Sequence, residues 1–248
     1  MNSARQSELF TLADKYFKIA SSHLNSGANL SDELRKAIKG TQINEEAEVP
    51  GFEERPMKFG KFVNRKFVIL MTDIRKSTDL INQEYGIINM FLIFYIYAGI
   101  VAKIVDTHKG TSTEFLGDGV LNLFDTENIG LDRALMNSMG AALEIMDARH
   151  FILNPFFSQV GLPNINLGIG IDHGVTIVTK FGYRNDTDLK AFGRCVYNAA
   201  KYCKGYNTIY VSEDSKTNWP ITPGGKLIFG TPIQVEDKLA YPARINQI

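Results

Sequence analysis

The stretch FVILMTDIRKST, residues 67–78, carries the strongest structural signal in the chain. Its first five residues are apolar and rich in strand formers, which predicts a buried strand that ends at Thr72 and Asp73. The polar turn that follows opens a long helix, expected to run from Ser77 or Thr78 to about Thr107. An acidic side chain therefore leaves the end of a buried strand just before a helix begins.

A hairpin is expected next along the chain. Two short strand-like runs, at about residues 111–116 and 120–124, flank the sequence LGDG at residues 116–119. Asp-Gly between two such runs is the strongest short-range hairpin signal. The hairpin places Asp118 at the tip of its turn.

The remaining pattern predicts further alternation of helices and strands before a β-rich tail. His173 and Gly174 are expected to form a turn between two strands, with Asp172 beside them as a candidate for the site. The expected elements are a helix over 131–150, strands over 166–171 and 175–179, a helix over about 194–204, and a strand over 208–211. The order β-α-β-β-α-β predicts an α+β fold: a ferredoxin-like (palm-like) antiparallel sheet with helices on one face.

The N-terminal part differs from the rest in composition. Helices are expected over residues 8–25 and 31–39, and the acidic, proline-containing stretch NEEAEVPGFEERP, residues 44–56, is typical of a linker. We therefore expect residues 1–56 to form a helical N-terminal extension with an acidic linker. Residues 57–248 are expected to form the main domain.

Charge and cysteine content limit the partners and the compartment. Lys+Arg and Asp+Glu are equal at 27 each, so no overall field favours nucleic acid, and any anion must bind to a local cluster. The two cysteines, Cys195 and Cys203, are eight residues apart in one expected helix, too far for a disulfide. A reducing cytoplasm is the expected location.

One apolar run could be mistaken for a membrane span. The sequence MFLIFYIYAGIVA, residues 90–102, contains no charged residue. It is shorter than the roughly 20 residues that a bilayer span needs. We expect a helix buried against the sheet and against a second subunit, without stable membrane insertion.

The chemistry is expected where the first strand meets the hairpin. In a β-α-β-β sheet these strands are neighbours, so Asp73 and Asp118 should converge. Two facing carboxylates repel each other unless a cation lies between them. Asp73, Asp118 and the carbonyl group of Ile74 are therefore predicted to hold two divalent cations, Mn²⁺ or Mg²⁺, as a clamp at a phosphoryl centre. Taken singly, Asp73 would be read as a helix N-cap and Asp118 as an ordinary turn residue.

Four segments together resemble the class III adenylate and guanylate cyclases. TDIRKST, EFLGDGVLNLF, GIDHG and FGRCVYNAAK occur in the order and at the spacing of that family, over roughly residues 62–215. The resemblance implies a homodimer with composite active sites and two divalent ions on the two aspartates. It also implies attack of a 3′-hydroxyl on the α-phosphorus of a nucleoside triphosphate, with pyrophosphate leaving. Diguanylate cyclases share the sheet, but no G-G-[DE]-E-F analogue occurs here.

The resemblance assigns roles to individual positions. Glu114 and Lys190 fall where family members read the base. A Glu at the first position resembles guanylate cyclases and a Lys would resemble adenylate cyclases. The triphosphate is expected to face the Thr78 side chain and the backbone N–H groups of the preceding turn, formed by Arg75, Lys76 and Ser77.

Two positions depart from the family. Tyr197 stands where the family's Asn orients the ribose, and Lys201 stands where its Arg stabilises charge on the α-phosphate. Lys keeps the charge but loses the bidentate fork, and Arg194 and Lys204 are nearby alternatives. The departures leave open a catalytically degenerate domain that senses a nucleotide. A purely structural ferredoxin-like protein would leave the aspartate pair unexplained.

The base is not decided by donors and acceptors alone. A carboxylate and an ammonium group satisfy guanine, uracil, cytosine or adenine, and the large side chains Phe115 and Phe192 are expected to tighten the pocket against a purine. A small cyclase domain with these departures looks like the pyrimidine cyclases of bacterial antiphage (Pycsar) systems. That resemblance implies UTP as substrate, with GTP the runner-up and CTP and ATP open, and a cyclic UMP product read by a separate effector.

Overall fold

The computed structural model describes residues 1–22, 24, 62–82, 84–183, 186–221 and 225–245. The helix expected over residues 31–39 and the linker expected over residues 44–56 lie outside this part of the chain. The boundary between residues 56 and 57 lies there too, and it stays a prediction.

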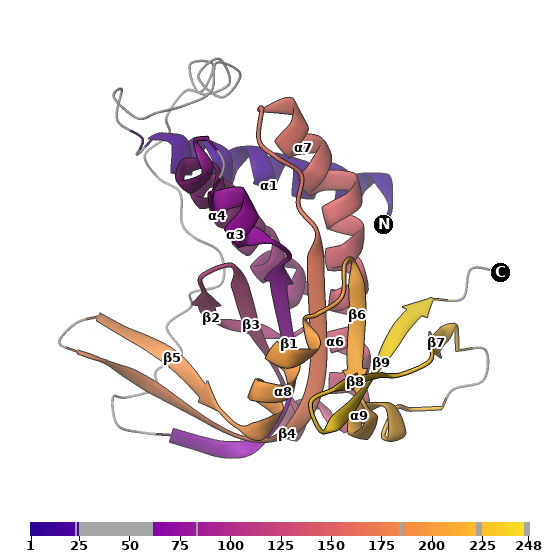
Figure 1. The fold of residues 1–248 in the computed structure, drawn as a ribbon. Helices are drawn as coiled ribbons and strands as arrows, with labels where there is room; N and C mark the ends of the chain where they lie inside the picture. The colour runs from indigo at the N-terminus through magenta and orange to yellow at the C-terminus, as the bar shows by residue number, and fades with distance from the viewer. Residues whose placement is uncertain (23, 25–61, 83, 184–185, 222–224, 246–248) are drawn as a thin grey trace.

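One open sheet runs through the molecule (Figure 1). The strands pair in the order β2-β3-β1-β4-β6-β9-β7, while β5 pairs with β4 and β8 pairs with β9. The pairs are antiparallel except β4 with β6. The strands are β1 (Phe62–Ile74), β2 (Thr111–Leu116), β3 (Gly119–Asp125), β4 (Leu167–Tyr183), β5 (Asp186–Phe192), β6 (Thr208–Ser212), β7 (Leu227–Phe229), β8 (Ile233–Val235) and β9 (Lys238–Ile245). The inner order β2-β3-β1-β4 is that of a ferredoxin-like sheet, so the predicted α+β fold is confirmed.

The helices cover both faces of this sheet. They are α1 (Ser3–Ser22), α3 (Ser77–Ile81), α4 (Gly86–Thr107), α5 (Thr126–Ile129), α6 (Leu131–Ala148), α7 (Asn154–Gln159), α8 (Arg194–Tyr202) and α9 (Glu213–Thr217), with a π-helical turn η1 (Arg149–Leu153) between α6 and α7. Because strand side chains alternate, Val68 and Leu70 of β1 pack with α1, α4 and α6, whereas Ile69 and Met71 pack with α8. The expected helical face is present, and α8 adds cover on the second face.

Helix α8 lies directly on the backbone of β4. A Cβ atom added at Gly170 would lie 2.0 Å from the carbonyl oxygen of Ala199, so only glycine allows the helix to approach this closely. Cys195 and Cys203 face this interface, and both are buried. Neither forms a disulfide, in keeping with their predicted separation along one helix. The close packing fixes which side of α8 is exposed.

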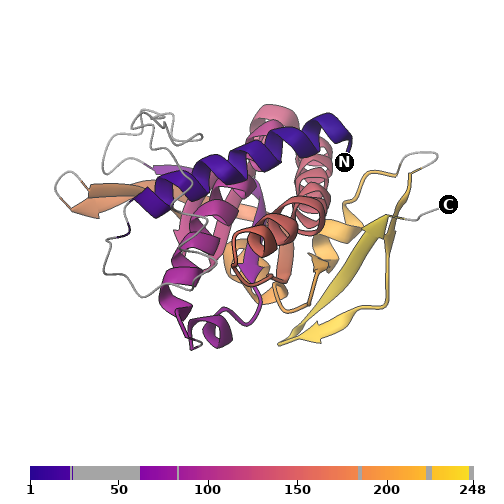
Figure 2. The same cartoon turned by 90° about the horizontal axis from the view of Figure 1, so that it is seen from above.

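The N-terminal helix belongs to the main core. It buries Leu9, Tyr16 and Phe17 in the same cluster as α4 and α6, and Figure 2 shows it crossing both helices. Arg5 Nε lies 2.7 Å from a Glu144 carboxylate oxygen, and the Met1 ammonium group lies 3.1 Å from Asp147. The helix starts and ends a few residues before the expected 8–25.

The prediction of a single helix over residues 77–107 is wrong. The structure has a short α3, a left-handed residue at Tyr85 (φ 62°), and then α4. A Cβ atom at Gly86 would lie 2.1 Å from the carbonyl oxygen of Ile81, so the chain turns back on itself there. Periodicity continues across such a turn, and for this reason the sequence pattern hides it.

The prediction of a turn at His173 and Gly174 is also wrong. Strand β4 is continuous, because β1 pairs with it on both sides of this point: Val68 faces His173 and Phe67 faces Gly174. The ladder of hydrogen bonds to β1 overrides the local preference of the sequence His-Gly. Strand β4 then continues with β5 into an arm that projects from the sheet (Figure 1).

Helix α4 is the apolar element of the chain. Among the described residues it is the one helix long and apolar enough to cross a membrane, with a hydropathy of 2.0. In the structure 61% of its apolar window is buried, and its side chains pack with α1, α6 and the sheet. A core helix explains this composition.

Candidate active site

The ends of β1 and of the β2–β3 hairpin bring Asp73 and Asp118 together. Asp73 pairs with Gly119 across the ladder. The N–H group of Ile74 donates to the carbonyl oxygen of Asp118 at 3.2 Å. Asp118 therefore sits directly beside the end of β1, as the strand order predicted.

The electrostatics of this pair favour an added cation. Burial, and next the nearby Asp118 carboxylate, raise the pKa of Asp73 to about 6, while a hydrogen bond and the charge of Arg75 oppose the rise. Arg75 Nη1 lies 2.5 Å from Asp73 Oδ2. The Ser77 hydroxyl donates to the Asp118 carboxylate. One guanidinium group and one hydroxyl thus hold the two acids, and the pKa of Asp73 stays raised despite the guanidinium group.

Two carboxylates and one backbone carbonyl at the end of β1 would suit Mg²⁺ or Mn²⁺ only together with ligands from the substrate and water. No group of three or more His, Cys, Asp or Glu side chains suited to a metal occurs among the described residues. Two carboxylates and a backbone carbonyl are the kind of set with which Mg²⁺ is bound when substrate phosphates and water complete the coordination. Asp73, Asp118 and the Ile74 carbonyl would hold such ions, and their role as ligands stays a prediction.

The turn after β1 is less helical than expected. Lys76 adopts a left-handed conformation (φ 59°) and is the N-cap of α3, which is five residues long. The Lys76 side chain is exposed, with its ammonium group 4.0 Å from Asp79 and above the ring of Tyr206. Thr78 is exposed as well. The predicted phosphate cradle therefore rests on a single helical turn.

Glu114 and Lys190 form a pair, although they come from strands 76 residues apart. Glu114 on β2 is buried, and Lys190 Nζ on β5 lies 3.1 Å from its Oε2. The backbone N–H of Ala191 donates to Glu114 Oε1 at 2.7 Å. The structure thus brings the two predicted base-reading residues together.

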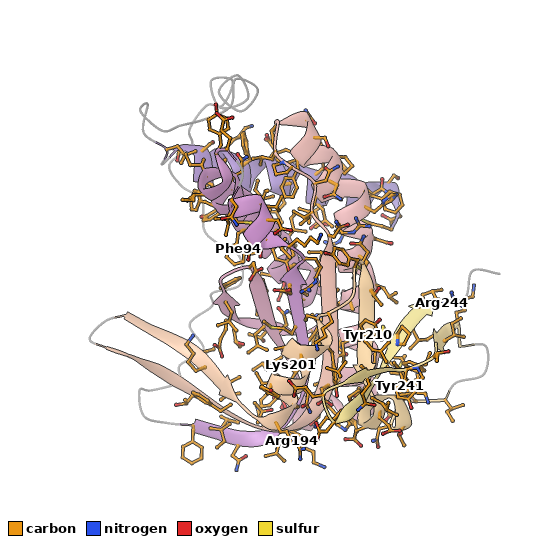
Figure 3. All side chains as sticks on the ribbon, viewed as in Figure 1. Phe94, Arg194, Lys201, Tyr210, Tyr241 and Arg244 are labelled. Carbon is orange, nitrogen blue, oxygen red and sulfur yellow. The ribbon has the colours of Figure 1, made fainter. Side chains whose placement is uncertain are left out.

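The aromatic neighbours do not enclose this pair. Phe115 and Phe192 are both exposed, by 37% and 56%. The Phe115 ring lies edge-on against Phe94 of α4, which Figure 3 labels. The expectation that both rings tighten the pocket is not met within the chain, because Phe115 turns toward α4 and Phe192 toward solvent.

A third group lies on the exposed side of α8. Lys201 Nζ lies 3.0 Å from Glu236 Oε1 and 5.1 Å from the centre of the Tyr197 ring. The Tyr197 hydroxyl lies 3.2 Å from both carboxylate oxygens of Glu236. The carboxylate hydrogen bond raises the pKa of Lys201, and the ammonium group in turn lowers the pKa of Glu236.

Sequence analysis missed Glu236 entirely. It lies in the two-residue turn between β8 and β9, within the segment expected only to be β-rich. The turn reads Glu-Asp and contains no glycine or asparagine. The one available signal was an acidic pair between two short apolar runs, and nothing local linked it to α8.

The two alternative cations, Arg194 at the start of α8 and Lys204 just beyond its end, differ in position. Arg194 begins the helix and Lys201 lies seven residues later, about 10 Å along the axis. Figure 3 labels both residues at separate places. Lys204 lies close enough to Glu236 to lower the pKa of that carboxyl group. Arg194 is thus separated from the Lys201 group, whereas Lys204 adjoins it.

Asp172 is buried away from the aspartate pair. It accepts hydrogen bonds from the His173 N–H at 2.8 Å and from Asn198 Nδ2 at 2.7 Å. With Arg194 and Asn198 it lines a cavity of about 710 Å³ between α8, β4 and the β8–β9 turn. Its two oxygens are already bonded within the chain, so it orders α8 on β4.

The predicted site residues thus form three groups within one chain. Among the described residues, no hydrogen bond or ion pair joins the Asp73–Asp118 pair to Glu114–Lys190 or to the Lys201 group. The first group can bind cations, the second offers an acceptor and a donor, and the third offers an exposed cation. Such a division is what a site completed by a second copy would need.

Comparisons with known proteins point to the nucleotide cyclases. No protein-family model matches the chain. It is 26% identical over 154 residues to an adenylate cyclase of Anabaena cylindrica, covering 62% of this chain and 30% of that protein. It is 27% identical over 165 residues to an uncharacterised protein of Mycobacterium tuberculosis, covering 66% of this chain and 28% of that protein. The chain thus spans less than a third of the length of these relatives.

Solved structures share the fold. The adenylyl cyclase CyaB from P. aeruginosa has a TM-score of 0.64 at 19% identity, covering 75% of this chain and 97% of that one. The guanylyl cyclase Cya2 has a TM-score of 0.59 at 24% identity, covering 73% and 92%. A guanylyl cyclase domain from Blastocladiella emersonii, described as a non-canonical dimer, has a TM-score of 0.60 at 16% identity, covering 76% and 99%. The chain has the fold of these cyclase domains.

Proposed function

We propose that this chain is a class III nucleotide cyclase that converts a nucleoside triphosphate to its 3′,5′-cyclic monophosphate and pyrophosphate. The convergence of Asp73 and Asp118 at the end of β1 is the observation on which the proposal rests. The similarity to an adenylate cyclase and the cyclase fold support the same activity. A degenerate domain would gain nothing from a second carboxylate that raises the pKa of Asp73.

The chain's own groups divide the work of the reaction. Divalent cations bound at Asp73, Asp118 and the Ile74 carbonyl would polarise the α-phosphate and ease deprotonation of the 3′-hydroxyl. Arg75 and Ser77 orient the two carboxylates. The remaining positive charge for the triphosphate comes from Lys201. The turn after β1 supplies the backbone N–H groups of Lys76 and Ser77, since the N–H group of Arg75 donates to the Asn166 carbonyl oxygen at 2.8 Å.

We propose a homodimer with composite sites. Lys201 and Tyr197 are exposed on α8 and separate from the aspartate pair of their own chain. A partner's α8 facing that pair would bring a cation to the triphosphate. The proposal places the protein in the cytoplasm, because two buried free cysteines need no oxidising compartment.

The proposed base is uracil. Glu114 keeps acceptor capacity beside a fixed Lys190 donor, and this pair would accept from N3–H and donate to a carbonyl oxygen of uracil. The role in antiphage defence, with cyclic UMP read by a separate effector, follows from the resemblance to pyrimidine cyclases. GTP is the second candidate, because Glu114 could also accept from N1–H and the amino group of guanine.

The experiment is product identification from each of the four nucleoside triphosphates with Mn²⁺. Purified protein should release pyrophosphate and a single cyclic monophosphate, cyclic UMP, as resolved by chromatography and mass. Cyclic GMP as the main product would replace the base assignment while leaving the activity intact. Nucleotide binding without pyrophosphate from any triphosphate would establish the degenerate sensing domain instead.

A further inference from the structure

The turn between β8 and β9 has an unusual residue at its first position. Strand β8 ends at Val235 and β9 begins at Lys238, so the turn consists of Glu236 and Asp237. Glu236 has φ 54°, in the left-handed region. Two-residue hairpin turns with positive φ at this position favour glycine, because a Cβ atom is strained there. The backbone alone gives no reason for a glutamate.

The side chain of Glu236 supplies a reason. Its carboxylate accepts from the Tyr197 hydroxyl and pairs with the Lys201 ammonium group, which also lies over the Tyr197 ring. The turn is held in register by Gln234 Nε2, which donates to the Glu236 carbonyl oxygen at 2.8 Å. A strained backbone residue thus aims one carboxylate at two side chains of α8.

The physical need for such a contact follows from lysine itself. A lysine ammonium group is a point charge on a flexible four-carbon stem, and it has no planar fork to fix its direction. The Lys201 side chain is 42% exposed, so packing does not hold it. A carboxylate 3.0 Å from the ammonium group and an aromatic ring whose centre lies 5.1 Å from it restrict the side chain and fix the direction of the charge.

We propose that Glu236 is a positioning residue: its carboxylate and the Tyr197 ring fix the Lys201 ammonium group so that it faces the phosphate charge of the substrate. The inference rests on the proposed function. It assigns to the β8–β9 turn a part in the reaction, although Glu236 itself touches no reacting atom. Lys204, which also lies near Glu236, supplies a second positive charge to the same carboxylate.

The test uses Glu236→Gly, which removes the carboxylate and relieves the backbone at once. The variant should melt at the same or a higher temperature, since both ion-pair partners are exposed. Its kcat for cyclisation should fall roughly fivefold with KM nearly unchanged, because only orientation of the cation is lost. The kcat of Glu236→Gln, which keeps a hydrogen-bond acceptor, should lie between those of the wild type and Glu236→Gly.

A double-mutant cycle separates positioning from a general structural effect. In a Lys201→Ala background Glu236→Gly should cause no further loss, because the residue it positions is gone. Glu127→Ala is the matched control, since it breaks an exposed ion pair with Arg65 that includes no residue of α8 or of the β8–β9 turn, and it should leave kcat unchanged.

Three results would overturn the inference. Wild-type or higher kcat in Glu236→Gly would mean that the carboxylate is idle or restrains Lys201. An equal loss in the presence and absence of Lys201 would mean that Glu236 acts elsewhere. Absence of cyclic product from the wild-type protein with every triphosphate would remove the proposed function and this inference together. The first two results differ from it because they are obtained with an active wild-type protein.

Discussion

At the end of β1, Asp73 and Asp118 lie together in a partly buried place, and their charges are only partly balanced. Lys201 on α8 and Glu236 in the β8–β9 turn are both exposed to solvent, and each charge has its partner in the other. Ionising Asp73 costs free energy when no cation is bound, while the Lys201–Glu236 pair needs no ligand to balance its charges. The aspartate pair therefore gains from binding a cation, whereas the exposed face of α8 keeps its arrangement without a ligand.

The largest effect should come from the aspartate pair. Asp118→Asn keeps the shape of the side chain but removes the charge, and should reduce cyclisation by about 10³-fold or more. Pyrophosphate release measured with saturating Mn²⁺ checks this. Asp79→Asn, which changes an exposed carboxylate in α3, is the control and should keep full activity. Retention of half the activity in Asp118→Asn would end the assignment.

The ionised form of Asp73, which the proposed activity needs, should lower the stability of the metal-free protein. In the folded protein the pKa of Asp73 is raised from 3.8 to about 6, so the folded state binds the proton more tightly than the unfolded chain. Without divalent metal, the free energy of unfolding should therefore fall as pH rises from about 4 to 6. Urea unfolding across this range measures it.

Asp73→Asn sharpens this prediction. The variant should lose that part of the pH dependence and, at pH 7 without metal, be more stable than the wild type while being inactive. A variant that is less stable than the wild type at pH 7 would show that the Arg75 pair outweighs the cost of burial.

The exposed face of α8 should respond more mildly. Lys201→Ala should lower kcat about 10- to 100-fold, because it removes one cation from the phosphate charge without disturbing the core. Lys201→Arg should retain most of the activity. Steady-state kinetics measure both, and equal rates for Lys201→Ala and wild type would return the cationic role to Lys204.

The smallest effect is expected at the Glu114–Lys190 pair. Glu114→Lys places two ammonium groups together, and it should change the preference between UTP and GTP by about tenfold as measured by kcat/KM. The exchange Glu114→Lys with Lys190→Glu should restore fold stability with the altered preference. Unchanged selectivity in both variants would remove the pair from base reading.

Local sequence signals located one of the two regions well. The apolar run ending in Asp73 and the Asp-Gly turn at Asp118 each carry their own pattern, and the strand order then placed them side by side. The α8 region depends on contacts that no local pattern encodes. The β5 strand that carries Lys190 and the turn that carries Glu236 are defined by pairing with β4 and β9.

The errors have the same origin. Continuous β4 at His173 results from pairing with β1, and the break before α4 results from the close turn at Gly86. In both places tertiary contacts decide against the local preference. Elements with strong periodicity, such as α6 and β3, were predicted within a few residues.

Direct measurement of Mn²⁺ binding tests the central claim most closely. Electron paramagnetic resonance or calorimetry with a non-cyclisable nucleoside triphosphate analogue should show two Mn²⁺ ions bound per site in the wild-type protein and in Asp79→Asn. Asp73→Asn and Asp118→Asn should each lose at least one of them. Unchanged Mn²⁺ stoichiometry and affinity in both aspartate variants would contradict the account.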